Sequence, residues 1–181
     1  MVTGELVCAE VGTPLGPMVA MAEVRGLVML EFADRPALPA EVEELRTRYG
    51  YVAGPGRNGH IDCVERELAA YFAGELRAFT VPVVAPGTGF QTQVWTALRE
   101  IPYGTTTSYG ELARQIGVPG AVRAVGRANG QNRMSVVIPC HRVIGADGSL
   151  TGYGGGQRRK AFLLKLEGVT RAQGRLFGEA S

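Results

Sequence analysis

A stretch rich in proline and glycine, Val81–Gly89, divides this chain into two parts of different character. Such a segment breaks helices and strands and is typical of a domain boundary. The part before it reads mainly as strands and turns, and the part after it mainly as helices. With 181 residues the chain is long enough for two small domains. We therefore predict an N-terminal sheet and helix domain over 1–80, a C-terminal helix-turn-helix domain over 88–170 and a tail over 171–181.

Short apolar or alternating runs separated by turn residues fill the first part of the chain, and they predict an antiparallel meander. The expected strands are Leu6–Val11, Met18–Val24 and Leu27–Phe32. A charged helix is expected over 39–49, a flexible loop over 54–59, and an amphipathic helix over 61–73.

The second part carries four expected helices. They span 90–100, 109–116, 121–128 and 157–166. Ser108 and Glu111 form an S-x-x-E capping box at the start of the second of these helices. A glycine-containing turn joins the second helix to the third, which makes a helix-turn-helix pattern that plain helical hairpins share.

The composition predicts a protein of a reducing compartment without a membrane segment. No apolar run reaches the roughly 18 residues needed to span a bilayer. Residues 1–5 lack the basic and then apolar order of a signal peptide. Three cysteines are too few, and odd in number, for a disulfide framework. We therefore expect a cytoplasmic protein.

Charge is unevenly divided between the two parts. Residues 1–87 carry 7 basic and 12 acidic side chains, whereas residues 88–181 carry 12 basic and 5 acidic ones. A basic half joined to an acidic half is typical of a protein that meets a polyanion with one face. Chance and ordinary solvated surfaces produce the same asymmetry, so charge alone does not establish that the protein binds a polyanion.

The expected helix over 121–128 has an unusual composition. Small residues surround Arg123 and Arg127, and no Gln, Ser or Thr is present to read base edges in the major groove. The small residues are Ala121, Ala124, Gly126 and Ala128. A helix lying against the narrow minor groove needs such residues, and an arginine among them can enter the base stack. Close helix packing is an equally good explanation of the pattern.

The candidate nucleophile follows a short apolar run. Residues 135–138 read as a buried strand, and Pro139 suits its end. Cys140 comes next, beside His141 and Arg142, and neighbouring cationic or basic groups favour the reactive thiolate. Cysteine is also a common inert core residue. The adjacent His-Arg pair favours a functional thiol over an inert one.

Three further features bear on chemistry. The glycine-rich segment 148–156 is typical of a loop that lets a flat ligand approach the backbone, or of a long surface turn. Glu167 stands at a helix end where its charge opposes the helix dipole, which suggests another role. His60, Asp62 and Cys63 offer too few soft ligands for a zinc site. We predict neither a metal nor a cofactor.

Several motifs together resemble the O6-alkylguanine-DNA alkyltransferases, also called methylated-DNA–protein-cysteine methyltransferases. The resemblance covers residues 88–168, and the first 87 residues match only in general character. Its motifs are Gly89-Phe90-Gln91-x-x-Val94-Trp95, Ser108-Tyr109-Gly110-Glu111-Leu112-Ala113, Arg123-Ala124-Val125-Gly126, Pro139-Cys140-His141-Arg142-Val143, Gly152-Tyr153-x-Gly155-Gly156 and Leu163-Leu164-x-x-Glu167-Gly168.

The resemblance implies roles for four catalytic residues. Cys140 resembles the alkyl acceptor. His141 and Glu167 resemble the pair that takes the thiol proton through a water molecule. Tyr109 is similar to the phenol that donates a proton to the guanine ring as the base leaves.

The resemblance also implies how the damaged base is held. Arg123 resembles the side chain that replaces the extruded base, and the helix around it would contact DNA. Tyr153 and the Gly154 backbone would line the base pocket, with the Val143 carbonyl facing the guanine amine. Asn132 resembles a hinge residue between the recognition helix and the active site. The remaining residues expected at the DNA are Ala121, Ala124, Gly126, Arg127 and Arg133.

Arg133 departs from the family pattern, which usually has proline after the hinge asparagine. This change either loosens the hinge or adds a phosphate contact. Gly154 replaces a serine of some members, and its backbone N–H survives that change.

The resemblance implies an α+β fold in which an N-terminal small-sheet domain of ribonuclease H type packs on a C-terminal winged-helix DNA-binding domain. The implied activity is direct reversal of DNA damage, in which a flipped O6-alkylguanine gives its alkyl group irreversibly to Cys140. The implied partner is double-stranded DNA bound through the minor groove by a monomer. Two rivals are a lesion-flagging binding protein, which would lack Cys140, and a turnover-competent cysteine hydrolase.

Overall fold

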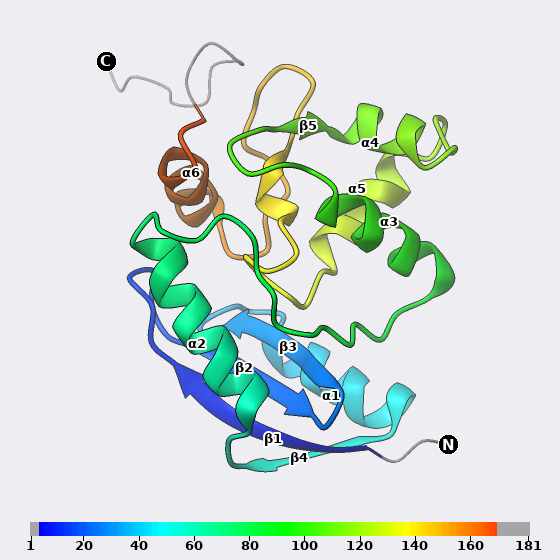
Figure 1. Ribbon diagram of the computed structural model, residues 1–181. Coiled ribbons are helices and arrows are strands. Elements are labelled where there is room, and N and C mark those ends of the chain that lie inside the picture. The colour runs from blue at the N-terminus through cyan, green and yellow to red at the C-terminus, as the bar shows by residue number, and fades with distance from the viewer. Residues whose placement is uncertain (1–3, 170–181) are drawn as a thin grey trace. The chain divides into compact units, whose positions relative to one another are not determined.

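The computed structural model describes residues 4–169 and divides the chain into two compact units (Figure 1). The first unit contains the residues up to Pro86 together with Arg133–Val137. The second contains Gly87–Asn132 and the residues from Ile138 onward. The tail predicted over 171–181 lies outside the described residues. Within the described range, no helix is long and apolar enough to cross a membrane.

A four-stranded sheet forms the centre of the first unit. Its strands are β1 (Gly4–Val11), β2 (Met18–Glu23), β3 (Gly26–Phe32) and β4 (Tyr51–Pro55), in the order β3-β2-β1-β4. β1, β2 and β3 pair antiparallel, which confirms the predicted meander. β4 pairs parallel to β1 and was not predicted, because its last two residues, Gly54 and Pro55, read as a loop.

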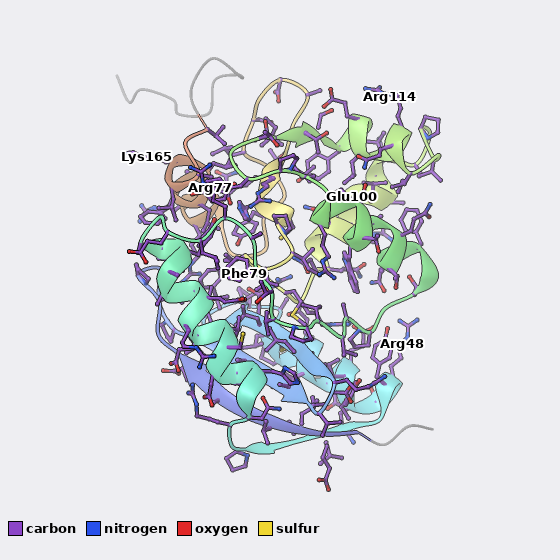
Figure 2. The ribbon with its side chains drawn as sticks, in the orientation of Figure 1. Arg48, Arg77, Phe79, Glu100, Arg114 and Lys165 are labelled. Atoms are coloured by element: carbon purple, nitrogen blue, oxygen red, sulfur yellow. The ribbon has the colours of Figure 1, made fainter. Side chains whose placement is uncertain are left out.

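Two helices complete the first unit. In α1 (Leu38–Tyr49), Leu45 joins a core cluster that includes Leu6 and Met21. α2 (Gly59–Phe72) begins where the Asn58 side chain accepts hydrogen bonds from two backbone N–H groups, a standard N-cap. This helix crosses the sheet in Figure 1 and buries its apolar stripe. Phe79, labelled in Figure 2, then packs its ring 5.4 Å from that of Tyr71.

Backbone from two distant segments covers the free edge of β3. The Leu27 N–H donates to the Pro82 carbonyl over 2.8 Å. The Leu30 N–H donates to the Arg133 carbonyl, and the Leu30 carbonyl accepts from the Ser135 N–H, each over 2.8 Å. Covering an edge in this way satisfies backbone groups that would otherwise pair with another chain.

Residues 135–137 form a turn and Ile138 a bend, so the prediction of a buried strand here is wrong. Met134 makes a single bridge to Leu30, and Val136 then adopts a φ of 72°. A β-branched residue rarely takes this left-handed conformation, which stores strain of about 1–3 kcal/mol. The run is apolar because the turn is buried.

The second unit is mainly helical. Its elements are α3 (Gly89–Arg99), β5 (Thr107–Ser108), α4 (Tyr109–Gln115), α5 (Val122–Gly130), a 3-10 turn (Cys140–Arg142), β6 (Val143–Ile144) and α6 (Gln157–Leu166). The predicted capping box of Ser108 and Glu111 begins α4. The indole N–H of Trp95 on α3 donates to the Ala128 carbonyl on α5 over 2.8 Å, which fixes two helices together. β5 and β6 form a short parallel pair.

Candidate active site

Cys140 begins the 3-10 turn and is almost fully buried. It does not end a strand, as the sequence had suggested, because the preceding residues form turns. The Asn132 side-chain N–H donates to the Cys140 Sγ over 3.1 Å and to the Ile138 carbonyl over 2.9 Å. A donor aimed at sulfur stabilises a thiolate more than a thiol. The Asn132 side chain thus holds the sulfur and the backbone leading to it.

His141 and Glu167, which lie 26 residues apart in the chain, meet with their side chains fully buried. The His141 Nε2 lies 2.8 Å from the Glu167 Oε1. Arg142 donates through Nε to Glu167 Oε2 over 2.9 Å and through Nη2 to Oε1 over 3.0 Å. Burial would raise the pKa of Glu167, but the hydrogen bonds from His141 and Arg142 outweigh it and hold that pKa at about 2.

This ionised carboxylate determines which imidazole nitrogen carries the proton. A carboxylate only accepts hydrogen bonds, so the Nε2 of His141 must be the donor. Its Nδ1 then has a lone pair, and that atom is buried with no protein partner among the described residues. Burial lowers the pKa of His141 and keeps the ring neutral. The arrangement makes Nδ1 a base oriented by Glu167. It also explains an acidic residue at the unfavourable end of α6.

Tyr109, the first residue of α4, directs its hydroxyl toward the loop after β6. The hydroxyl donates to the Thr151 carbonyl over 2.9 Å. Gly152 has a φ of 77°, and a Cβ on it would lie 2.5 Å from the Tyr109 oxygen, so only glycine permits this approach. Burial, followed by the negative charge of Cys140, raises the pKa of Tyr109 to about 12. The phenol is therefore protonated at neutral pH.

Lys160 also lies at the site, although it was not predicted from the sequence. Its side chain is fully buried on α6, where Nζ donates to the Val143 carbonyl and, over 2.8 Å, to the Thr151 carbonyl. Burial lowers its pKa to about 8, and the nearby Cys140 charge opposes that fall. The sequence did contain a signal for the burial of Lys160, because this residue shares a helical face with the apolar Leu163 and Leu164.

The residues expected to line the base pocket lie around the same loop. The Val143 carbonyl, expected to face the guanine amine, accepts from Lys160 and has a second lone pair. Tyr153 is buried, with its ring edge-on to that of His141 at 6.5 Å between centroids. Gly154 is exposed, which leaves its backbone accessible.

The exposed face of α5 carries the residues expected at DNA. Arg123, Ala124 and Arg127 are exposed, and Ala121 and Gly126 are partly exposed. The opposite face is buried and carries Val125, Ala128 and Asn129. The helix therefore presents small residues and two arginines outward.

Comparisons with known proteins identify the family. Residues 89–169 match the profile described as "6-O-methylguanine DNA methyltransferase, DNA binding domain", and residues 6–85 match that of its "ribonuclease-like domain". The methylated-DNA–protein-cysteine methyltransferase of Mycobacterium leprae is 45% identical over 160 residues, which cover 88% of this chain and 91% of that protein. The chain belongs to the 6-O-methylguanine DNA methyltransferase family.

Solved structures of this family support the fold. A crystal structure of the Mycobacterium tuberculosis O6-methylguanine methyltransferase has a TM-score of 0.76 and 45% identity, covering 90% of this chain and 92% of that one. Another, of the M. tuberculosis protein in complex with DNA, has a TM-score of 0.76 and 43% identity, covering 95% and 96%. These matches confirm the predicted α+β fold with a ribonuclease-like and a DNA-binding domain.

The departure from the family pattern at Arg133 now has a structural explanation. Arg133 is buried in the first unit, where its guanidinium pairs with Glu44 and donates to the Pro86 carbonyl over 2.8 Å. The same group lies 5.7 Å from the centre of the Tyr49 ring, in the range of a cation–π contact. This placement favours a structural role for Arg133 over a phosphate contact.

Proposed function

We propose that this protein repairs DNA by transferring an alkyl group from O6-alkylguanine irreversibly to Cys140, once per molecule. Family membership supports alkyl transfer to cysteine as the activity. The observation that carries the assignment is the juxtaposition of Cys140, held by Asn132, with the His141–Glu167 pair. No other cysteine of the chain follows a proline and precedes a histidine.

The proposed reaction begins with the thiol proton. The Nδ1 of His141 takes it through a water molecule, and Glu167 stabilises the imidazolium that forms. The thiolate attacks the alkyl carbon, so that the S–C bond forms as the C–O bond to guanine breaks. The electron pair goes to the guanine ring, which takes the Tyr109 proton. The product thioether resists hydrolysis, so one transfer ends the activity.

The damaged base reaches Cys140 only if it leaves the duplex. Extruding a base costs a few kcal/mol, less when the pair is damaged. The proposed interface is the exposed face of α5 lying against the minor groove, where small residues fit and Arg123 fills the space left by the base. Val143, Tyr153 and the Gly154 backbone would hold the extruded guanine. Arg127 would contact a phosphate.

We further propose that the protein acts in the cytoplasm as a monomer, without a cofactor and without a membrane partner. The proposed domains are 1–80 and 88–170. This assignment does not place Arg133 at the DNA, since its guanidinium is paired internally.

The test is one incubation with excess duplex oligonucleotide carrying O6-methylguanine, followed by intact mass. We expect a gain of one methyl group, on the peptide that contains Cys140. Cys140→Ser should abolish transfer yet retain DNA binding, because a hydroxyl is a far weaker nucleophile at neutral pH. Cys8→Ser and Cys63→Ser, at half-buried thiols, serve as matched controls that keep full transfer. Product beyond one equivalent per protein would instead support the hydrolase alternative.

A further inference from the structure

Asn129 is a buried polar residue of α5 to which the mechanism above gives no role. Its side chain is 1% exposed, and neither its amide nitrogen nor its oxygen forms a hydrogen bond of standard geometry within residues 4–169, although the Tyr109 phenol lies close enough to feel the carboxamide. A carboxamide offers two N–H donors and an acceptor oxygen, and burying these groups unpaired is costly. Native proteins rarely leave such groups unsatisfied, and this burial therefore points to a function for the Asn129 amide.

The geometry of α5 places Asn129 beside Tyr109. A Cβ on Gly126 would lie 3.7 Å from the Tyr109 Cδ1 atom, so α5 runs directly along this ring. Asn129 follows Gly126 by three residues and is its neighbour on the helix surface, where the partly exposed face meets the buried one. The Asn129 carboxamide also lowers the pKa of Tyr109 against burial and the Cys140 charge, which raise it. A donor near the phenol oxygen has this effect.

We propose that Asn129 is a positioning residue that donates an N–H to the Tyr109 oxygen while Tyr109 protonates the departing guanine. This inference rests on the proposed function. In the structure the Tyr109 hydroxyl donates to the Thr151 carbonyl, so its proton must leave that carbonyl to reach the base. An N–H from Asn129 fixes the oxygen through a lone pair and leaves the O–H free to turn.

The same contact stabilises the charge that the step creates. As the C–O bond of the substrate breaks, its electron pair passes to the guanine ring. The ring forms a new N–H bond with the Tyr109 proton, and the O–H electron pair stays on the phenol oxygen as a phenolate. Solvent later returns a proton. A preorganised donor at the place where charge develops lowers the barrier to reaching it.

The test is a double-mutant cycle between Asn129→Leu and Tyr109→Phe, read as single-turnover alkyl transfer from methylated duplex DNA. We expect Asn129→Leu to slow transfer about tenfold when Tyr109 is present, the size of one hydrogen bond. In the Tyr109→Phe background it should cause no further slowing. Equal slowing in both backgrounds, or none in either, would overturn the inference.

Two controls separate positioning from folding. Alkylation of Cys140 by iodoacetamide needs no proton for the leaving iodide, so Asn129→Leu should leave that rate unchanged. Gln131→Leu removes an amide at the end of α5 that bonds Gln91, and it should not slow transfer. Asn129→Asp, which keeps the shape and loses the donors, should slow transfer like Asn129→Leu. A parent protein that transfers no alkyl group would overturn the proposed function instead.

Discussion

At the scale of single residues, Lys160 holds a buried ammonium group that interacts electrostatically with Cys140. With a pKa of about 8, Lys160 is mostly charged at neutral pH and favours the Cys140 thiolate. Lys160→Met should therefore move the pH midpoint of Cys140 alkylation by iodoacetamide upward by about one pH unit. Stopped-flow rates between pH 5 and 10, roughly the range over which thiols and lysines titrate, measure the midpoint.

The matched control for this residue lies on the same helix. Lys165, labelled in Figure 2, is exposed on α6, so Lys165→Met removes an equal charge at the surface. Solvent and salt screen such a charge, and its removal should leave the midpoint unchanged. Equal shifts in the two variants would show that net charge, rather than the buried ammonium, sets the reactivity of Cys140.

At the scale of elements, α5 presents two exposed arginines, Arg123 and Arg127, among small residues. Arg123→Ala should slow repair of duplex DNA by at least tenfold while leaving transfer from a free alkylated guanine base nearly unchanged. The free base needs no extrusion, so only the duplex reaction loses the replacing side chain, whose help is of the order of a few kcal/mol. The measurement is the single-turnover rate of the variant and of the parent protein on each of the two substrates. Equal losses on both would assign Arg123 to the chemistry or to the fold.

Elements with their own periodicity could be predicted from the sequence, whereas those defined by distant partners could not. The helix over 157–166 has the predicted bounds, because its apolar side and its ending at Glu167-Gly168 are local signals. β4 exists through parallel pairing with β1, and the buried turn at Val136 through contacts with β3. Cys140 could be predicted as the nucleophile because His141 and Arg142 follow it directly. The convergence of Glu167 on His141 came from the family resemblance, and Lys160 was missed because lysine usually lies at the surface.

At the scale of the whole molecule, the two units should respond to acid in opposite senses. In the second unit the pKa of Glu167 is about 2, below its ordinary value of 4.5, so its stabilisation is lost as the pH falls from 4.5 toward 2. A shift of this size corresponds to about 3 kcal/mol. The pKa of His141 is lowered by burial, so the unfolded chain takes that proton first, from about pH 6.5 downward. Both groups make acid destabilise this unit.

In the first unit, the buried carboxyl groups make acid stabilise the fold rather than destabilise it. Burial raises the pKa of Glu31 and of Glu41 above 4.5, so folding favours their protonation as the pH falls. Trp95, the single tryptophan of the chain, is buried in the second unit and reports on that unit alone. Acid titration should therefore change tryptophan fluorescence at a higher pH than it removes the far-ultraviolet circular dichroism of the sheet.

Glu167→Gln tests the assignment of this acid sensitivity. It should flatten the pH dependence of fluorescence-detected stability between 4.5 and 2, because the carboxyl group that titrates there is gone. At neutral pH it should destabilise the second unit by about 3–5 kcal/mol, since Arg142 keeps a buried charge without its carboxylate. Glu43→Gln, which removes an exposed carboxylate paired with Arg46 on α1, should change neither quantity appreciably. Coincident fluorescence and circular-dichroism transitions in the parent protein would mean that the units unfold as one, and that the opposite signs cancel within a single cooperative transition.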